Sequence, residues 1–229
     1  MQVCDNLPLD RLNEPVRARL ARHAEALGVQ VEVGTRGIAP AHLRQYVGIA
    51  RQFGSPLVRV VIDTADHRPE LAEVARLLGE ALPEFEAARI WLAIENHDRL
   101  RARELAALVR NLGSEYVGVC LDTVNSFGAL EGPEVVVGTL APLTVNLHLK
   151  EFTISRVGHL MGFAVQGRPL GQGRLDVPWL LQQLREAGRD PNAIIEQWTP
   201  RGKALEDTIA AELRWAEESI AYARTLIPE

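Results

Sequence analysis

The chain has 229 residues, of which 47% are hydrophobic and 24% charged, and its formal net charge is −5. This composition is ordinary for a globular protein that can bury a sizeable core. The negative charge and the absence of a lysine or arginine run exclude nucleic acid as an expected partner. No apolar run approaches the roughly 20 residues of a membrane span, so no membrane association is expected.

The N-terminal residues lack a charged segment followed by a long apolar stretch, which is the pattern of a secretory signal. Cys4 and Cys120 each lie in an apolar run without CxxC spacing. Such cysteines are typical of buried, reduced thiols and not of a disulfide framework. We therefore expect a cytoplasmic protein.

Short runs rich in Val, Ile and Leu alternate with helix-period segments along the whole chain. Asn13 can cap a first helix that Gly28 ends, Pro69 suits the first turn of a later helix, and Gly113 ends another. A last helix is predicted over about residues 204–226. The predicted strands cover residues 2–7, 29–34, 57–63, 90–96, 117–123, 144–150 and 193–198. Strands alternating with helices predict an α/β fold with a buried parallel sheet, and without a linker we expect one domain over residues 1–229.

Most of these strands end in polar residues. Glu95, Asp122 and Glu196 each follow a run of apolar residues, and His148 has an apolar neighbour on each side. Active sites of α/β barrels and open sheets form at the carboxyl ends of strands, where these residues would meet. Three converging carboxylates would repel one another unless a cation lay between them. One histidine with three carboxylates suits Mn²⁺, Mg²⁺ or Co²⁺, and Zn²⁺ is a further candidate.

The chain resembles the xylose isomerase-like barrel superfamily in a series of short motifs. They are Ile94-Glu95-Asn96-His97, Cys120-Leu121-Asp122-Thr123, Asn146-Leu147-His148-Leu149-Lys150-Glu151, Gly171-Gln172-Gly173 and Ile195-Glu196. The resemblance implies a TIM-type (β/α)8 barrel. It also implies that Glu95, Asp122, His148 and Glu196 are metal ligands, and that Glu95 and Glu196 flank the substrate as an acid/base pair.

Two positions depart from the superfamily pattern. Asn125 and Asn146 stand where many members have histidines. The endonuclease IV branch of the superfamily needs additional histidines to hold three zinc ions. Together with the acidic composition, these replacements argue against a nuclease.

Further residues are predicted near the site with weaker signals. Lys150 lies two residues after His148 and could stabilise a developing oxyanion, or pair with Glu151 or Asp176. Arg36 lies between glycines after a strand and could bind a carboxylate or phosphate, or form a surface salt bridge. His97 could contact substrate or support a ligand residue. The segment 152–173 is long enough for a loop that covers the substrate. The substrate-binding candidates are Arg36, Asn6, His97, Asn125 and Arg168.

The resemblance leads us to expect a divalent-metal-dependent isomerase or epimerase of a small sugar or sugar derivative, acting through an enediolate. The alternative is a metal-dependent lyase, a decarboxylase or dehydratase, that acts on an oxo-sugar acid or an inosose. A non-catalytic barrel is a third reading, against which the intact set of four ligands argues. We expect a small carbohydrate substrate and a homo-oligomer.

The number of strands predicts an incomplete barrel. Seven strands are found where a complete barrel has eight, and strand 2–7 corresponds to the second strand of the superfamily. We expect a gap between this strand and strand 193–198, filled by a neighbouring chain or by residues that precede Met1. The alternative is that residues 162–166 form a further barrel strand and close the barrel.

Overall fold

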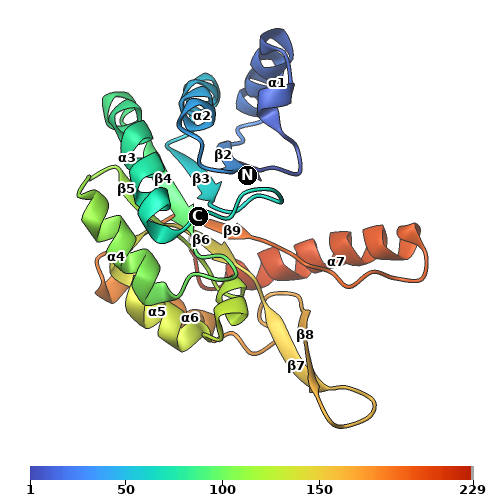
Figure 1. Cartoon of the computed structure of the whole chain (residues 1–229). Coiled ribbons are helices and arrows are strands. Elements are labelled where there is room, and N and C mark those ends of the chain that lie inside the picture. The colour runs from blue at the N-terminus through green and yellow to red at the C-terminus, as the bar shows by residue number, and fades with distance from the viewer. Residues whose placement is uncertain (228–229) are drawn as a thin grey trace.

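The computed structural model describes residues 1–227. It contains a sheet of parallel strands with helices between them (Figure 1). The strands of this sheet are β1 (Gln2–Val3), β2 (Glu32–Arg36), β3 (Leu57–Val61), β4 (Trp91–Glu95), β5 (Val117–Asp122), β6 (Thr144–Leu149) and β9 (Ala193–Ile195). The helices are α1 (Glu14–Ala26), α2 (Pro40–Phe53), α3 (Leu71–Ala88), α4 (Ala102–Leu112), α5 (Pro133–Leu140), α6 (Val177–Glu186) and α7 (Leu205–Ala223).

The sheet is a nearly closed barrel with seven strands in the order β1-β2-β3-β4-β5-β6-β9. Each pair is parallel, and the register brings strand ends together, with Glu95 opposite Cys120 and Asp122 opposite His148. Within residues 1–227, β1 pairs only with β2 and β9 only with β6. The predicted gap between the first and last strands is therefore present. The predicted first strand is shorter than expected, because the chain turns after Val3.

The segment 152–173 is a β-hairpin at its start and not a plain loop. Strand β7 (Phe152–Arg156) pairs antiparallel with β8 (Phe163–Gly167) in a separate two-stranded sheet, which projects from the barrel (Figure 1). The alternative in which residues 162–166 close the barrel is wrong. Residues 163–167 belong to the separate two-stranded sheet, and β6 pairs directly with β9, so no strand from this segment lies between them.

The helices begin and end largely where the sequence indicates. Asn13 caps α1 by accepting a hydrogen bond from the Val16 N–H at 3.0 Å. Gly113 follows α4 in the left-handed conformation with φ of 66°, which favours glycine. Pro69 is a small exception, because α3 starts two residues later at Leu71. No described helix is both long and apolar enough to cross a membrane.

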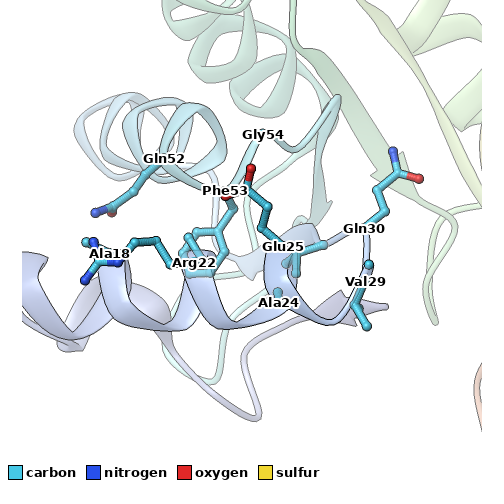
Figure 2. A pocket seen from close by; sticks show the side chains of 12 residues that line it. Ala18, Arg22, Ala24, Glu25, Val29, Gln30, Gln52, Phe53 and Gly54 are labelled. Carbon is cyan, nitrogen blue, oxygen red and sulfur yellow. The ribbon is translucent and has the colours of Figure 1, made fainter.

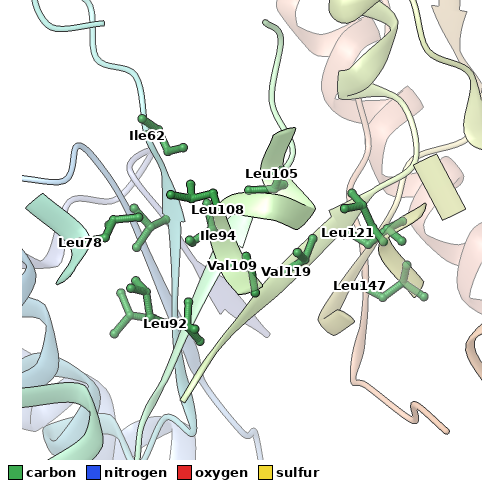
Figure 3. Packing of buried hydrophobic residues seen from close by; sticks show 14 of the residues in the cluster. Ile62, Leu78, Leu92, Ile94, Leu105, Leu108, Val109, Val119, Leu121 and Leu147 are labelled. Carbon is green, nitrogen blue, oxygen red and sulfur yellow. The ribbon is translucent and has the colours of Figure 1, made fainter. Parts of the chain in front are cut away.

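The core lies between the strands and the helices that cover them. Apolar side chains of β4 and β5, including Leu92, Ile94 and Leu121, meet the apolar face of α4 with Leu105 and Leu108 (Figure 3). These side chains are 0–5% exposed, as expected for a parallel sheet that is buried on both faces. This packing fixes the strands whose carboxyl ends carry the polar residues.

Helix α7 has an apolar face that is not covered. Ile209, Leu213 and Ile220 are 47%, 64% and 45% exposed. This helix extends away from the barrel (Figure 1).

Candidate metal centre

The four predicted metal ligands come together at the carboxyl end of the barrel. Glu95 and Asp122 are the last residues of β4 and β5, His148 lies in β6, and Glu196 follows β9. The Nδ1 atom of His148 is 3.5 Å from Glu95 Oε2, 3.9 Å from Asp122 Oδ2 and 2.7 Å from Glu196 Oε2. Parallel strands produce this convergence because their carboxyl ends open on the same side of the sheet.

Three of the converging atoms lack a hydrogen bond. Within the described residues, Asp122 Oδ2, His148 Nδ1 and Glu196 Oε2 are buried and have no hydrogen-bond partner. Ligand atoms of Asp122, His148 and Glu196 all lie within 4.8 Å of one another, as do those of Glu95, Cys120 and His148. Buried polar atoms without partners are rare and costly. A divalent cation fits this set, because it would take the free lone pairs of an imidazole and of carboxylates.

The backbone around Asp122 takes up only one of its two carboxylate oxygens. Asp122 Oδ1 accepts hydrogen bonds from the N–H groups of Val124 and Asn125, both at 2.8 Å. The Asn96 side chain accepts from the Asp122 N–H at 2.7 Å and donates to the Asp122 carbonyl at 2.8 Å. The carboxylate is therefore held in one orientation, with Oδ2 directed at His148.

Lys150 supplies positive charge to the same cluster. Its Nζ lies 3.0 Å from Asp122 Oδ2 and 3.0 Å from Glu196 Oε1, so it pairs with these residues and not with Glu151 or Asp176. Burial raises the pKa of Asp122 against the opposing charge of Lys150. Burial also acts to raise the pKa of Glu196, but the contact with His148 and the charge of Lys150 outweigh it and lower that pKa to about 2. Glu196 is thus poised as a carboxylate.

Glu95 is held by two neighbours in the barrel interior. Arg59 of β3 forms a buried ion pair with Glu95 Oε2, and Asn125 donates to Glu95 Oε1 at 2.6 Å. The same Asn125 accepts from Lys150 at 3.0 Å, so it links two predicted site residues. Arg59 is not among the site residues predicted from the sequence. Its signal is a lone arginine in the apolar run Leu57–Val61, since a buried guanidinium requires an anion.

A cavity of about 440 Å³ opens beside two of the four candidate ligands, His148 and Glu196. Asn6, Arg36 and His97 of the predicted substrate contacts line it, together with His148, Lys150 and Glu196. Arg36 pairs with Asp5 at 3.2 Å, and both side chains are partly exposed. Arg168 is exposed and is not among the lining residues.

A larger cavity of about 580 Å³ lies elsewhere, between the ends of α1 and α2 (Figure 2). Its walls include Ala24, Val29 and Phe53, with Arg22 and Glu25 as charged residues. Neither group of metal-ligating side chains lies there. The smaller cavity is therefore the candidate substrate site.

Glu151 organises the chain that follows the hairpin. Its carboxylate accepts hydrogen bonds from the backbone N–H groups of Phe152, Gly171, Arg174 and Leu175, at 2.9–3.0 Å. A Cβ atom on Gly173 would lie 2.4 Å from Glu151 Oε1 and 2.2 Å from the Phe152 carbonyl oxygen. Only glycine fits at residue 173, which gives a physical reason for the Gly171-Gln172-Gly173 motif.

Comparisons with known proteins identify the family of the chain. The family model described as xylose isomerase-like TIM barrel matches residues 35–219. The chain is 36% identical over 227 residues to a 3-oxo-isoapionate decarboxylase of Pectobacterium atrosepticum, covering 99% of this chain and 82% of that protein.

Solved structures share the fold at low identity. A D-psicose 3-epimerase, solved in the presence of D-fructose, has a TM-score of 0.75 and 15% identity, covering 100% of this chain and 89% of that one. A xylose isomerase-like TIM barrel protein of Mycobacterium smegmatis, in complex with magnesium, has a TM-score of 0.75 and 12% identity, covering 96% and 83%.

Proposed function

The chain belongs to the xylose isomerase-like TIM barrel family, and on this premise we propose that it is a divalent-metal-dependent enzyme. Its substrate is a small sugar or sugar derivative that reacts through an enediolate. The observation that carries the proposal is the convergence of three buried ligand atoms on Asp122, His148 and Glu196, none of which has a hydrogen-bond partner among the described residues.

Glu95, Asp122, His148 and Glu196 would hold the cation. Their hard oxygens and one imidazole suit Mn²⁺, Mg²⁺ or Co²⁺, with Zn²⁺ as a further candidate. When bound, such a cation supplies Lewis acidity to a carbonyl oxygen and an adjacent hydroxyl oxygen of the substrate.

Other roles in the reaction are proposed for the residues that line the cavity. Glu196 borders the cavity with a side chain that is 36% exposed, so it is placed to move a proton to or from a substrate carbon. Lys150 lines the same cavity and brings positive charge to a substrate oxygen that becomes negative. Arg36 and His97 are proposed to contact the other substrate oxygens.

The first candidate reaction is isomerisation or epimerisation. One carboxylate of the Glu95 and Glu196 pair removes a proton from carbon. The other returns a proton to the opposite face, or to the neighbouring carbon. This reaction needs both carboxylates to reach the substrate.

The second candidate reaction is decarboxylation of a 3-oxo sugar acid. The bond between the carboxylate and C2 breaks as CO₂ leaves, its electron pair forms the enediolate, and a proton is then delivered to C2. Such a reaction needs one proton donor and no carbon base. Two observations favour it. Arg59 and Asn125 contact the two oxygens of Glu95, whereas the first reaction needs this carboxylate to reach the substrate. The chain is also 36% identical to the decarboxylase relative.

One experiment tests the proposal and separates the two reactions. The Mn²⁺-loaded protein is incubated in D₂O with ketoses, inososes and 3-oxo sugar acids, and products are followed by ¹H NMR and by CO₂ release. Exchange of a C–H for C–D without CO₂ identifies the first reaction, and CO₂ release identifies the second. Turnover that is unchanged after chelation of the metal would contradict both.

A further inference from the structure

The side chain of Gln2 connects the candidate ligand His148 to a second buried carboxylate. Gln2 Oε1 lies 2.8 Å from His148 Nε2, on the side of the ring opposite the candidate metal centre. Gln2 Nε2 donates to Glu32 Oε2 at 3.1 Å and to Asn146 Oδ1 at 2.9 Å. Gln2, Glu32 and Asn146 are not among the four candidate ligands, but Gln2 connects them to the cluster through its contact with the His148 ring.

Glu32 fixes the orientation of the amides around it. It is 2% exposed, and its oxygens accept from Gln2, from Asn146 at 2.9 Å and from Asn192 at 2.8 Å. Rotating the Gln2 amide by 180° would place its oxygen against the Glu32 carboxylate and the Asn146 oxygen. Buried oxygens that face one another without a proton are strongly disfavoured. Gln2 must therefore present its oxygen to His148.

This orientation determines which nitrogen of His148 carries a proton. Because Gln2 Oε1 can only accept, Nε2 must donate, and the neutral imidazole keeps its lone pair on Nδ1. Nδ1 is the atom that faces Glu95, Asp122 and Glu196. Histidines that bind metals donate their other N–H to an oxygen acceptor, which fixes both tautomer and ring orientation.

We infer that Gln2 is a positioning residue that holds His148 with its proton on Nε2 and its Nδ1 lone pair directed at the cation, and that Glu32 acts through Gln2. The inference rests on the proposed metal centre. Neither Gln2 nor Glu32 is among the four candidate ligands. Gln2 also lines the candidate substrate cavity, but its orienting effect reaches the centre through one hydrogen bond, from His148 Nε2 to Gln2 Oε1.

The test measures Mn²⁺ affinity by calorimetry and the His148 tautomer by long-range ¹H–¹⁵N NMR of the metal-free protein, in which no cation imposes the tautomer. Glu32→Gln removes the carboxylate that orients Gln2. We expect the Mn²⁺ affinity to fall about 10–100-fold. We also expect the His148 signals to lose the single pattern with the proton on Nε2.

Two further variants separate positioning from general damage. Asn192→Ala removes another donor to Glu32 but does not touch Gln2, so tautomer and affinity should stay as in the wild type. The double variant Gln2→Glu/Glu32→Gln keeps one buried carboxylate and keeps an oxygen acceptor for the His148 Nε2 proton. It should recover the affinity to within about threefold, as expected if only the acceptor matters.

The outcomes distinguish this inference from the proposed function. If the wild type binds Mn²⁺ and Glu32→Gln binds it equally well with the same tautomer, the positioning role is wrong and the metal centre stands. An equal loss in Asn192→Ala would also overturn the inference, since it would indicate a merely structural effect. If the wild type binds no divalent cation, both are rejected.

Discussion

Replacing Arg59 by methionine tests whether the interior of the barrel is arranged around the charge of Glu95. The side chains of Arg59 and Glu95 are 6% and 0% exposed, so the substitution leaves a buried carboxylate without its ion pair. Breaking a buried pair by removing one partner typically costs about 3–5 kcal/mol. Asn125 still donates to Glu95 Oε1, so we expect the lower end, about 3 kcal/mol, in metal-free protein.

A bound cation should reduce this loss, because it compensates the same carboxylate. In saturating Mn²⁺ we expect the destabilisation to fall to roughly half. The loss in EDTA then exceeds the loss in Mn²⁺ by about 1.5 kcal/mol, which corresponds to roughly tenfold tighter Mn²⁺ binding by the variant than by the wild type. The assay is urea unfolding of wild type and Arg59→Met, each with EDTA and with Mn²⁺.

Two controls accompany the measurement. Arg44→Met breaks the exposed pair with Glu84, whose side chains are 41% and 40% exposed, and should leave the stability nearly unchanged, because water screens such a pair. Arg59→Met with Glu95→Gln removes both charges and should recover most of the stability in EDTA. A loss near 1 kcal/mol in EDTA, or one that Mn²⁺ leaves unchanged, would refute the reasoning about the buried pair.

Three further predictions follow from the same contacts. Glu196→Gln keeps an oxygen ligand but removes the proton-transferring carboxylate, so kcat should fall about 10²–10⁴-fold with the fold intact by circular dichroism; near-normal turnover would contradict that role. The hydrogen bond from Arg99 lowers the pKa of Asp63, so this pair should stabilise the protein at neutral pH and lose its contribution as the pH falls below about 4. Urea unfolding of Asp63→Asn against wild type should show a difference that shrinks in acid, and a constant difference would contradict this. Glu151→Ala leaves four backbone N–H groups without an acceptor and should destabilise the protein by at least about 3 kcal/mol in urea unfolding, whereas a loss below 1 kcal/mol would contradict it.

The strands and the convergence of the ligand residues could be predicted because both follow from local pattern. Glu95 and Asp122 come at the ends of apolar runs, and parallel strands bring such ends together whatever the details of packing. The number of barrel strands also followed from these runs. Within residues 1–227, β1 and β9 each pair on one side, as expected for a barrel with seven strands in place of eight.

The hairpin β7–β8 was missed because its signals are weak. Its strands carry exposed apolar residues such as Phe163, 65% exposed, and the connection of six residues between them lacks a two-residue turn signature. A short apolar run without such a turn does not indicate whether it pairs with a barrel strand or with the adjacent strand of a hairpin. Contacts that form only in the tertiary structure fix the base of the hairpin, among them the close approach of Gly167 to Trp198, where a Cβ atom would lie 2.5 Å from a carbonyl oxygen.

The polar network around Glu32 could not be predicted from local pattern. Gln2, Asn146 and Asn192 lie far apart in the chain and meet only when the barrel forms. A lone polar residue in a strand signals that a partner must exist, as for Arg59, but does not identify it. The alternative assigned to Lys150, a pair with Glu151 or Asp176, was wrong for the same reason.

The central claim is that Glu95, Asp122, His148 and Glu196 hold one divalent cation. Anomalous X-ray diffraction from crystals of the Mn²⁺-loaded protein tests it most directly, because the signal locates manganese independently of any assumed ligand. The account predicts a single strong peak about 2.0–2.6 Å from His148 Nδ1 and from oxygens of the three carboxylates. A peak at another position, or none at this end of the barrel, would contradict it.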